Sequence, residues 1–136
     1  MVQESIRNRL NINPVLMNTV IEGTIGGLAM SGIVPDAVGV SRFSTATRDL
    51  SVLVGLHGKR NGNMTLNLSE RTAMFLAGRL LGIDIKEVNE ETIDAICEIG
   101  NMVAGKFHTI LHHTPYRFDG ISLPALILAR ITIYTT

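Results

Sequence analysis

The sequence has no surplus of charge of either sign, because twelve Lys and Arg offset twelve Asp and Glu among its 136 residues. A protein that grips a phosphate backbone needs a basic excess. Tryptophan is absent and aromatic residues make up only 4% of the chain, so no platform for stacking bases is evident. These absences argue against nucleic acid binding as the main role.

Long apolar runs are also missing. The sequence contains neither eighteen consecutive apolar residues nor a basic start followed by an apolar run and a cleavage site. We therefore expect no membrane insertion, no secretion signal and a cytoplasmic location. The single cysteine, Cys97, cannot form an internal disulfide, which fits a reducing compartment. Hydrophobic residues make up 46% of the chain, enough for one compact domain over residues 1–136.

Start and stop signals predict three helices. Asn13 and Pro14 open the first, since Asn caps free amides and Pro has no N–H to lose. Ser69 caps the second, and Asn89 opens the longest, where acidic residues of the first turn complement the helix dipole. The predicted ranges are 14–30, closed by Ser31-Gly32; 70–81, closed by Gly82; and 90–112, closed by Pro115.

Extended segments rich in β-branched residues fill the rest. We expect strands over 38–46, 50–56 and 64–68, and two more within 116–136, broken near Ser122-Leu123-Pro124. Asn61-Gly62 is the expected turn centre of a hairpin between the second and third strands. The order of helices and strands predicts an α+β fold, with an antiparallel sheet packed against helices.

A faint internal repeat links the two halves. Glu22 and Glu98 each lie on a predicted helix that contains glycine, and Pro35 and Pro115 each follow that helix before extended chain. The two pairs are separated by 76 and 80 residues. A duplicated helix-then-strand unit explains this spacing, and so does a chance match between two similar helices.

The longest predicted helix has two contrasting faces. Its predicted buried stripe, spaced by three and four residues, comprises Ile93, Ile96, Cys97, Val103, Ala104, Phe107, Ile110 and Leu111. Gly100 lies within that stripe and is expected to admit another helix. The opposite line, predicted to be exposed, comprises Asp94, Glu98, Asn101, Gly105, His108 and His112. An exposed glycine costs a helix about 1 kcal/mol relative to alanine, so Gly105 indicates close approach by a partner.

A polar outer face is by itself ordinary. However, Asp94, Glu98 and Asn101, followed by Pro124 after twenty-two intervening residues, resemble the signature of the CheC/CheX/FliY family of chemotaxis phosphatases. Two further segments also resemble CheX proteins: the opening helix over 12–28 and the core of the catalytic helix over 100–105. The resemblance covers nearly the whole chain in element order.

The resemblance implies a CheX-like phosphatase with pseudo-duplicated helix-strand units. The substrate that the resemblance implies is the phospho-aspartate of a CheY-like response regulator. Asn101 is expected to hold the attacking water, and Glu98 to pair with the regulator's active-site lysine. This division suits phosphoryl transfer, which depends on positioning and charge stabilisation. The chain itself is expected to bind no metal or cofactor, because Mg²⁺ lies in the regulator's site.

The remaining positions of the motif have weaker assignments. Asp94 is expected to orient its helix neighbours, to contact the partner or to be an ordinary surface acid. Pro124 is interpreted as structural, fixing a strand edge near the catalytic helix. Superposing Glu22 on Glu98 aligns Asn18 with Asp94 and Ile25 with Asn101. Since a hydrocarbon cannot hold water, we expect one active centre per chain, as in CheX-like members, with Glu22 an ordinary surface acid.

The family also implies a homodimer built on terminal strands. We expect one here, although the chain ends at Thr136, where longer relatives continue into another strand. An exposed strand edge favours pairing with a second copy. Two non-catalytic readings remain open: an adaptor that docks response regulators or belongs to a motor switch, and a structural dimer that retains only the motif.

Other candidate residues have plainer explanations. His108, His112 and His113 include the i, i+4 spacing of zinc helices but lack a third ligand, so we expect them to complement the negative helix end. Cys97 is expected to be inert packing. Lys59 and Arg60 are expected to solubilise a hairpin tip. The acidic segment 84–98 is interpreted either as steering a basic rim of the partner or as a solvated face.

Overall fold

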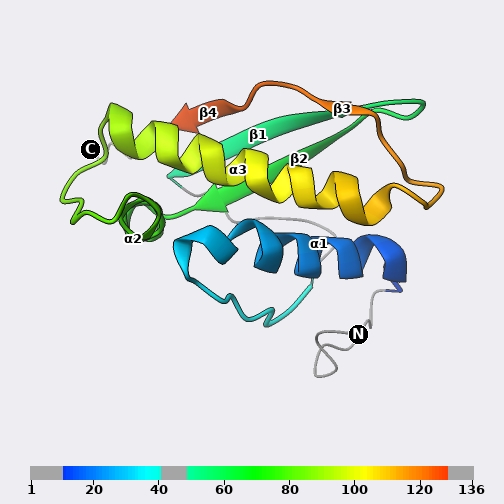
Figure 1. The fold of residues 1–136 in the computed structure, drawn as a ribbon, viewed down its shortest axis with the longest axis horizontal. Coiled ribbons are helices and arrows are strands. Elements are labelled where there is room, and N and C mark those ends of the chain that lie inside the picture. Colours follow the sequence, from blue (N-terminus) through cyan, green and yellow to red (C-terminus); the bar gives the residue numbers. More distant parts are fainter. Residues whose placement is uncertain (1–10, 41–48, 129–136) are drawn as a thin grey trace, which may run out of the picture.

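In the computed structural model, the described residues are 11–40 and 49–128. The elements in chain order are α1 (Pro14–Gly27), the 3-10 turn η1 (Ala29–Ser31), β1 (Leu50–His57), β2 (Gly62–Leu68), α2 (Glu70–Leu81), α3 (Glu90–Leu111), β3 (Gly120–Ile121) and β4 (Ala125–Leu128). Figure 1 shows α3 lying across one face of the sheet, with α1 alongside α3 and α2 next to the N-terminal half of α3. The predicted α+β fold with an antiparallel sheet is confirmed.

Strand β1 is the centre of the sheet. It pairs antiparallel with β2 on one side and with β3 and β4 on the other. Leu50, Val52 and Val54 alternate along β1 and are all buried, as expected for a strand with one face against helices. Gly100 of α3 lies directly over them, because a Cβ added there would come within 2.7 Å of Val52 Cγ1. Gly100 therefore admits a strand, and the prediction that it admits another helix is wrong.

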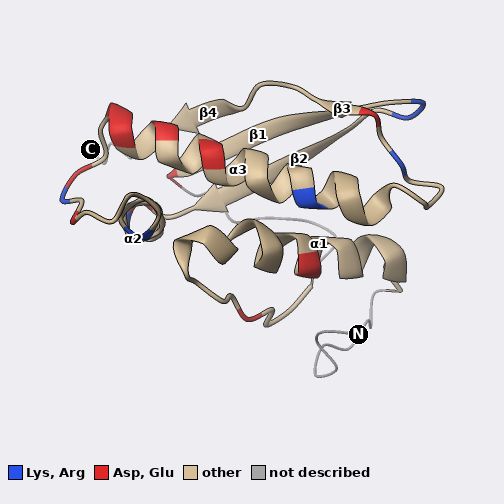
Figure 2. Ribbon diagram, viewed as in Figure 1, with Lys and Arg blue, Asp and Glu red and all other residues tan. Residues whose placement is uncertain are grey.

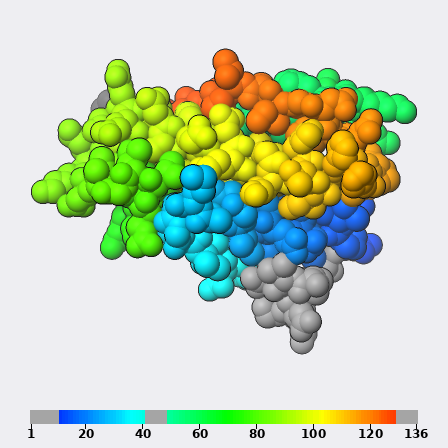
Figure 3. Space-filling view, viewed as in Figure 1, coloured from blue at the N-terminus to red at the C-terminus, as the bar shows by residue number. Residues whose placement is uncertain are grey.

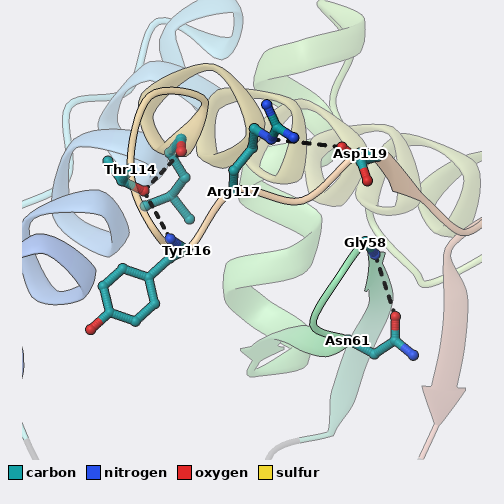
Figure 4. A network of polar contacts seen from close by, with 7 residues as sticks. Gly58, Asn61, Thr114, Tyr116, Arg117 and Asp119 are labelled. Atoms are coloured by element: carbon teal, nitrogen blue, oxygen red, sulfur yellow. Dashed lines mark hydrogen bonds and ion pairs between the residues drawn. The ribbon is translucent and has the colours of Figure 1, made fainter.

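The hairpin between β1 and β2 is confirmed, but its turn lies earlier than predicted. Gly62 pairs with Leu56 inside the ladder, so it belongs to the strand. A two-residue type I′ turn needs positive φ at both central residues, and neither Asn61 nor Gly62 has it. Instead, Asn61 Oδ1 accepts a hydrogen bond from the Gly58 N–H at 3.4 Å (Figure 4). This bond joins the first and last residues of the loop between β1 and β2.

The segment after α3 forms a turn where a strand was predicted to begin. Thr114 Oγ1 donates to the Leu111 carbonyl at 2.8 Å and accepts from the Tyr116 N–H at 3.2 Å (Figure 4). Such side-chain bonds compete with a ladder, and β3 starts only at Gly120. The segment lies beside the hairpin, since the Asp119 N–H donates to the His57 carbonyl at 2.7 Å.

The predicted break between the last two strands is confirmed, and the pairing register explains it. The Ser122 N–H donates to the Gly55 carbonyl at 2.9 Å, which continues the register of β3, and the Gly55 N–H donates to the Ser122 hydroxyl at 2.8 Å. Ala125 pairs with Leu53, so Leu123 and Pro124 together oppose only Val54. Two residues against one is the arrangement of a β-bulge, and proline cannot donate to a ladder. Residues 129–136, expected to be extended, lie outside the described part.

Most predicted helix boundaries are confirmed. Helix α2 runs over Glu70–Leu81 between a Ser69 cap and Gly82, whose φ of 71° is left-handed. Helix α3 begins after Asn89, whose side chain and that of Thr92 cap each other's backbone. Helix α1 starts at Pro14 as predicted but ends at Gly27, and η1 occupies the last predicted turn. Residues 38–40 are not in a strand, and the rest of the strand predicted over 38–46 lies outside the described residues.

The two long helices approach each other closely and run antiparallel. A Cβ added at Gly27 would lie 2.7 Å from the Val103 Cα, and one at Gly23 would lie 2.2 Å from the Phe107 ring. Positions 27 and 103 differ by 76, the same offset that relates Glu22 to Glu98. Equivalent residues meet in this way where a local two-fold axis passes between duplicated helices. The contact therefore favours the duplicated unit over the chance match.

Candidate active site

The outer face of α3 carries the three polar residues of the motif. Asp94, Glu98 and also His112 are exposed, as predicted, whereas Asn101 and Gly105 are half-buried. Figure 2 shows that acidic residues are concentrated along the N-terminal half of α3. His108 is half-buried as well. The prediction that all six residues of this line are exposed is therefore correct for three of them and wrong for the other three.

The buried side of α3 is wider than one stripe. The prediction missed Thr92, Ala95 and Ile99, which are buried, while Ile93, Cys97 and Ile110 are only half-buried. Helix α3 packs against α1 and α2 as well as against the sheet. Contacts on two sides bury a broader arc than the single face that the three- and four-residue spacing describes.

The Asn101 amide is in an unusual state for a helix residue. Its Oδ1 is buried and accepts no hydrogen bond from the described residues. A buried acceptor without a partner costs about 1–3 kcal/mol, and such a group calls for a specific explanation. A purely structural role does not supply one, because an apolar side chain would fill the same position without that cost.

Pro124 lies at the same level of the sheet as the turn of α3 that holds Asn101. Gly100 packs on Val52 and Val54 of β1, and the bulge containing Pro124 lies opposite Val54 on the neighbouring strand. The structural role expected for Pro124 fits this position, since the bulge ends one short strand and starts the next. Sequence spacing alone does not reveal the bulge, because it arises from pairing with a strand about seventy residues away.

Gly105 has open space around it. A Cβ added there would meet nothing within 4 Å, in contrast to Gly27 or Gly100. We expect Gly105→Ala to stabilise the protein by about 0.5–1 kcal/mol, because alanine is the better helix former. If a partner approaches here, the same change weakens its binding. Chemical denaturation and titration with the partner measure the two effects, and unchanged affinity would place Gly105 outside the interface.

Cys97 and the histidines do not form a second reactive centre. Burial, with a smaller contribution from the Asp94 carboxylate, raises the pKa of the Cys97 thiol above its ordinary value. The thiol is therefore protonated at neutral pH, which agrees with the predicted inert role. The rings of His108 and His112 lie with their centroids 6.0 Å apart and their planes tilted by 47°. Within 11–40 and 49–128, no three His, Cys, Asp or Glu residues converge as metal ligands.

The corresponding turn of α1 differs from the motif in burial. Glu22 is half-buried, whereas Glu98 is exposed, so the expectation of an ordinary surface acid holds only in part. Asn18 resembles Asn101 in having a buried Oδ1 without a partner among the described residues. Ile25 occupies the position equivalent to Asn101. A single active centre per chain remains the prediction.

Comparison with known proteins decides the family. Residues 50–130 match the family described as chemotaxis phosphatase CheX, and this range contains the whole motif from Asp94 to Pro124. The chain belongs to the CheX family. For the described residues, no helix has the length and apolar character needed to span a membrane.

Individual CheX relatives support this placement. The chain is 29% identical over 82 residues to the CheY-P phosphatase CheX of Thermotoga maritima, which covers 60% of this chain and 52% of the relative. The chain thus spans about half the length of that relative. A putative chemotaxis protein from Desulfovibrio vulgaris Hildenborough has a similar structure, with a TM-score of 0.76, 29% identity and coverage of 88% of this chain and 78% of that one.

A third relative has been solved with a partner. The CheX-CheY-BeF3-Mg+2 complex from Borrelia burgdorferi matches with a TM-score of 0.65 and 27% identity, covering 82% of this chain and 75% of that chain. The CheX fold predicted from the motif is therefore confirmed by sequence and structural comparison.

Proposed function

We propose that this CheX-family domain dephosphorylates a CheY-like response regulator. The observation that carries the proposal is the Asn101 amide, whose Oδ1 is buried with no hydrogen-bond partner in the described part of the chain, beside an exposed Glu98. The Asn101 side chain as a whole is only half-buried, so a change of its rotamer can present the amide to a partner in a complex. Family membership and the relatives' names support the same activity.

In the proposed reaction, water is added to the acyl phosphate of the regulator. The water oxygen forms a bond to phosphorus, the bond from phosphorus to the aspartyl oxygen breaks, and inorganic phosphate and a free carboxylate result. Asn101 supplies an amide that both donates and accepts hydrogen bonds, so it can hold the water in line. Its contribution is positioning, which accounts for much of the catalysis of phosphoryl transfer.

Glu98 has a different role in this proposal. A carboxylate next to the phosphoryl oxygens would repel them, so Glu98 is assigned to a cation, the active-site lysine of the regulator. The Mg²⁺ belongs to the regulator in this reading, and no residue of this chain is assigned to it. Asp94, one turn before Glu98 and exposed, lies where it can orient Glu98 or extend the contact.

The direct test is a phosphate-release assay. Purified CheY-type receiver domains are phosphorylated with acetyl phosphate, and the decay of the acyl phosphate is followed with and without this protein. The proposal predicts faster decay for at least one receiver. Binding without acceleration would support the adaptor reading, and neither binding nor acceleration would support the structural one.

The role of Glu98 is tested by charge reversal. We expect Glu98→Lys to weaken binding of the activated receiver at least about tenfold, because a close opposite-charge pair becomes a like-charge pair. Exchange of the receiver lysine for glutamate should restore part of the loss only in combination with Glu98→Lys. Glu91→Lys, on the same helix and also exposed, is the matched control. If both changes weaken binding equally, the effect of Glu98 comes from the overall negative charge of the helix and not from a specific pair with the receiver lysine.

A further inference from the structure

A second surface feature lies along α2, which packs against α3, and has no role in the proposed chemistry. It is a hollow between η1 and α2 with a volume of about 840 Å³. Its lining includes Met30, Phe75 and Ile83, which are 78%, 57% and 47% exposed. Arg71 and Arg79 of α2 also line it. We call this feature the α2 hollow.

The antiparallel helix pair places the α2 hollow beside the motif. Gly23 meets Phe107 and Gly27 meets Val103, so moving forward along α1 means moving back along α3. The C-terminal end of α1 therefore lies against the part of α3 around Val103, and η1 follows directly after it. Helix α2 contacts both η1 and α3, and Figure 3 shows the light-blue end of α1, the green α2 and the yellow-green N-terminal half of α3 meeting on one face of the molecule.

The hollow is lined by two arginines and one carboxylate, Asp84, so its charge is net positive where the motif is acidic. Arg79 is held in place, with Nε donating to the Ser31 carbonyl at 3.3 Å and Nη2 donating to the Gly32 carbonyl at 3.4 Å. Neither Arg71 nor Arg79 has a carboxylate within 4.0 Å among the described residues, where the single ion pair joins Arg117 to Asp119. Both guanidinium groups are thus available to an acidic side chain from outside.

The size of a specific interface requires such a neighbouring surface. A stable protein complex covers about 800 Å² on each partner, far more than the side chains of Glu98 and Asn101 present. Exposed aromatic, Met and Arg residues are enriched in such interfaces. The α2 hollow supplies these residue types within reach of a partner that covers the motif.

We propose that the α2 hollow is the docking site for the receiver domain on which Asn101 acts. The receiver places an apolar side chain against Met30 and Phe75 and a carboxylate against the two arginines, while its lysine meets Glu98. The inference rests on the proposed function for the identity of the partner. It adds a surface that fixes affinity without taking part in hydrolysis.

The test separates binding from chemistry. Phe75→Asp and Arg71→Glu change exposed side chains, so folding is retained. Each is expected to raise the Kd for a beryllium-fluoride-activated CheY-type receiver about tenfold or more, and to raise KM while kcat stays within about twofold. Val38→Asp, an apolar residue 96% exposed elsewhere, and Lys59→Glu at the hairpin tip are the controls and should leave Kd and KM unchanged.

Two results would overturn the docking site. One is receiver binding by both hollow variants within twofold of the parent protein. The other is a loss of self-association in sedimentation experiments with unchanged receiver binding, which would assign the hollow to a second copy of this chain. If the parent protein binds the receiver without accelerating hydrolysis and the hollow variants lose that binding, the docking site stands and the phosphatase proposal fails.

Discussion

Replacing Asn101 with alanine is expected to lower the acceleration of receiver dephosphorylation by at least about 100-fold. The amide is the group assigned to the attacking water, and alanine offers no atom in its place. Receiver binding should be nearly unchanged, because the docking contacts belong to Glu98 and the α2 hollow. Phosphate release at saturating receiver measures the rate, and titration with a beryllium-fluoride-activated receiver measures affinity.

The stability of the same variant provides a second readout. Asn101→Ala removes a buried acceptor that has no partner within 11–40 and 49–128, so the free energy of unfolding should be unchanged or higher. Loss of activity together with retained or raised stability is typical of a residue kept for function. A variant that hydrolyses the phosphorylated receiver at the parent rate would contradict the mechanism. A variant that loses stability in proportion to activity would assign Asn101 a structural role.

The largest loss of stability is expected at the crossing of α1 and α3. A Cβ at Gly27 would come within 2.4 Å of the Val103 Cγ2 and within 2.8 Å of the Val103 backbone N. A side chain can rotate away, but a helix backbone cannot move without its neighbours. We expect Gly27→Ala to destabilise the protein by about 3 kcal/mol, at the upper end of the range for overpacked cores. Chemical denaturation gives the free energy, and calorimetry gives the Tm.

The chain offers a matched control for this substitution. Gly105→Ala adds the same methyl group to a helix, but at a position with nothing within 4 Å, and it should stabilise. Opposite signs for the two variants would show that the Gly27 effect comes from the helix crossing. Equal and small effects would mean that α1 and α3 adjust easily, and the local two-fold contact would then have no energetic weight.

Local signals in the sequence predicted much of the fold. Ser69, Gly82 and Asn89 act through their own side chain or backbone within one helical turn, so their effect does not depend on distant contacts. Asn61-Gly62 shows the limit of that approach. The pair favours a tight turn, but Gly62 pairs with Leu56 and is therefore part of strand β2.

The candidate site divides in the same way. The sequence by itself determined the family, because the spacing of Asp94, Glu98, Asn101 and Pro124 is a linear property of the chain. Only the tertiary structure decided that Asn101 Oδ1 is buried with no partner among the residues described, and that Pro124 lies in a bulge. It also decided that the space beside Gly27 is taken up by Val103, whereas the space beside Gly105 is open. Each of these depends on contacts between segments far apart in the chain, which residue spacing along one helix or strand does not contain.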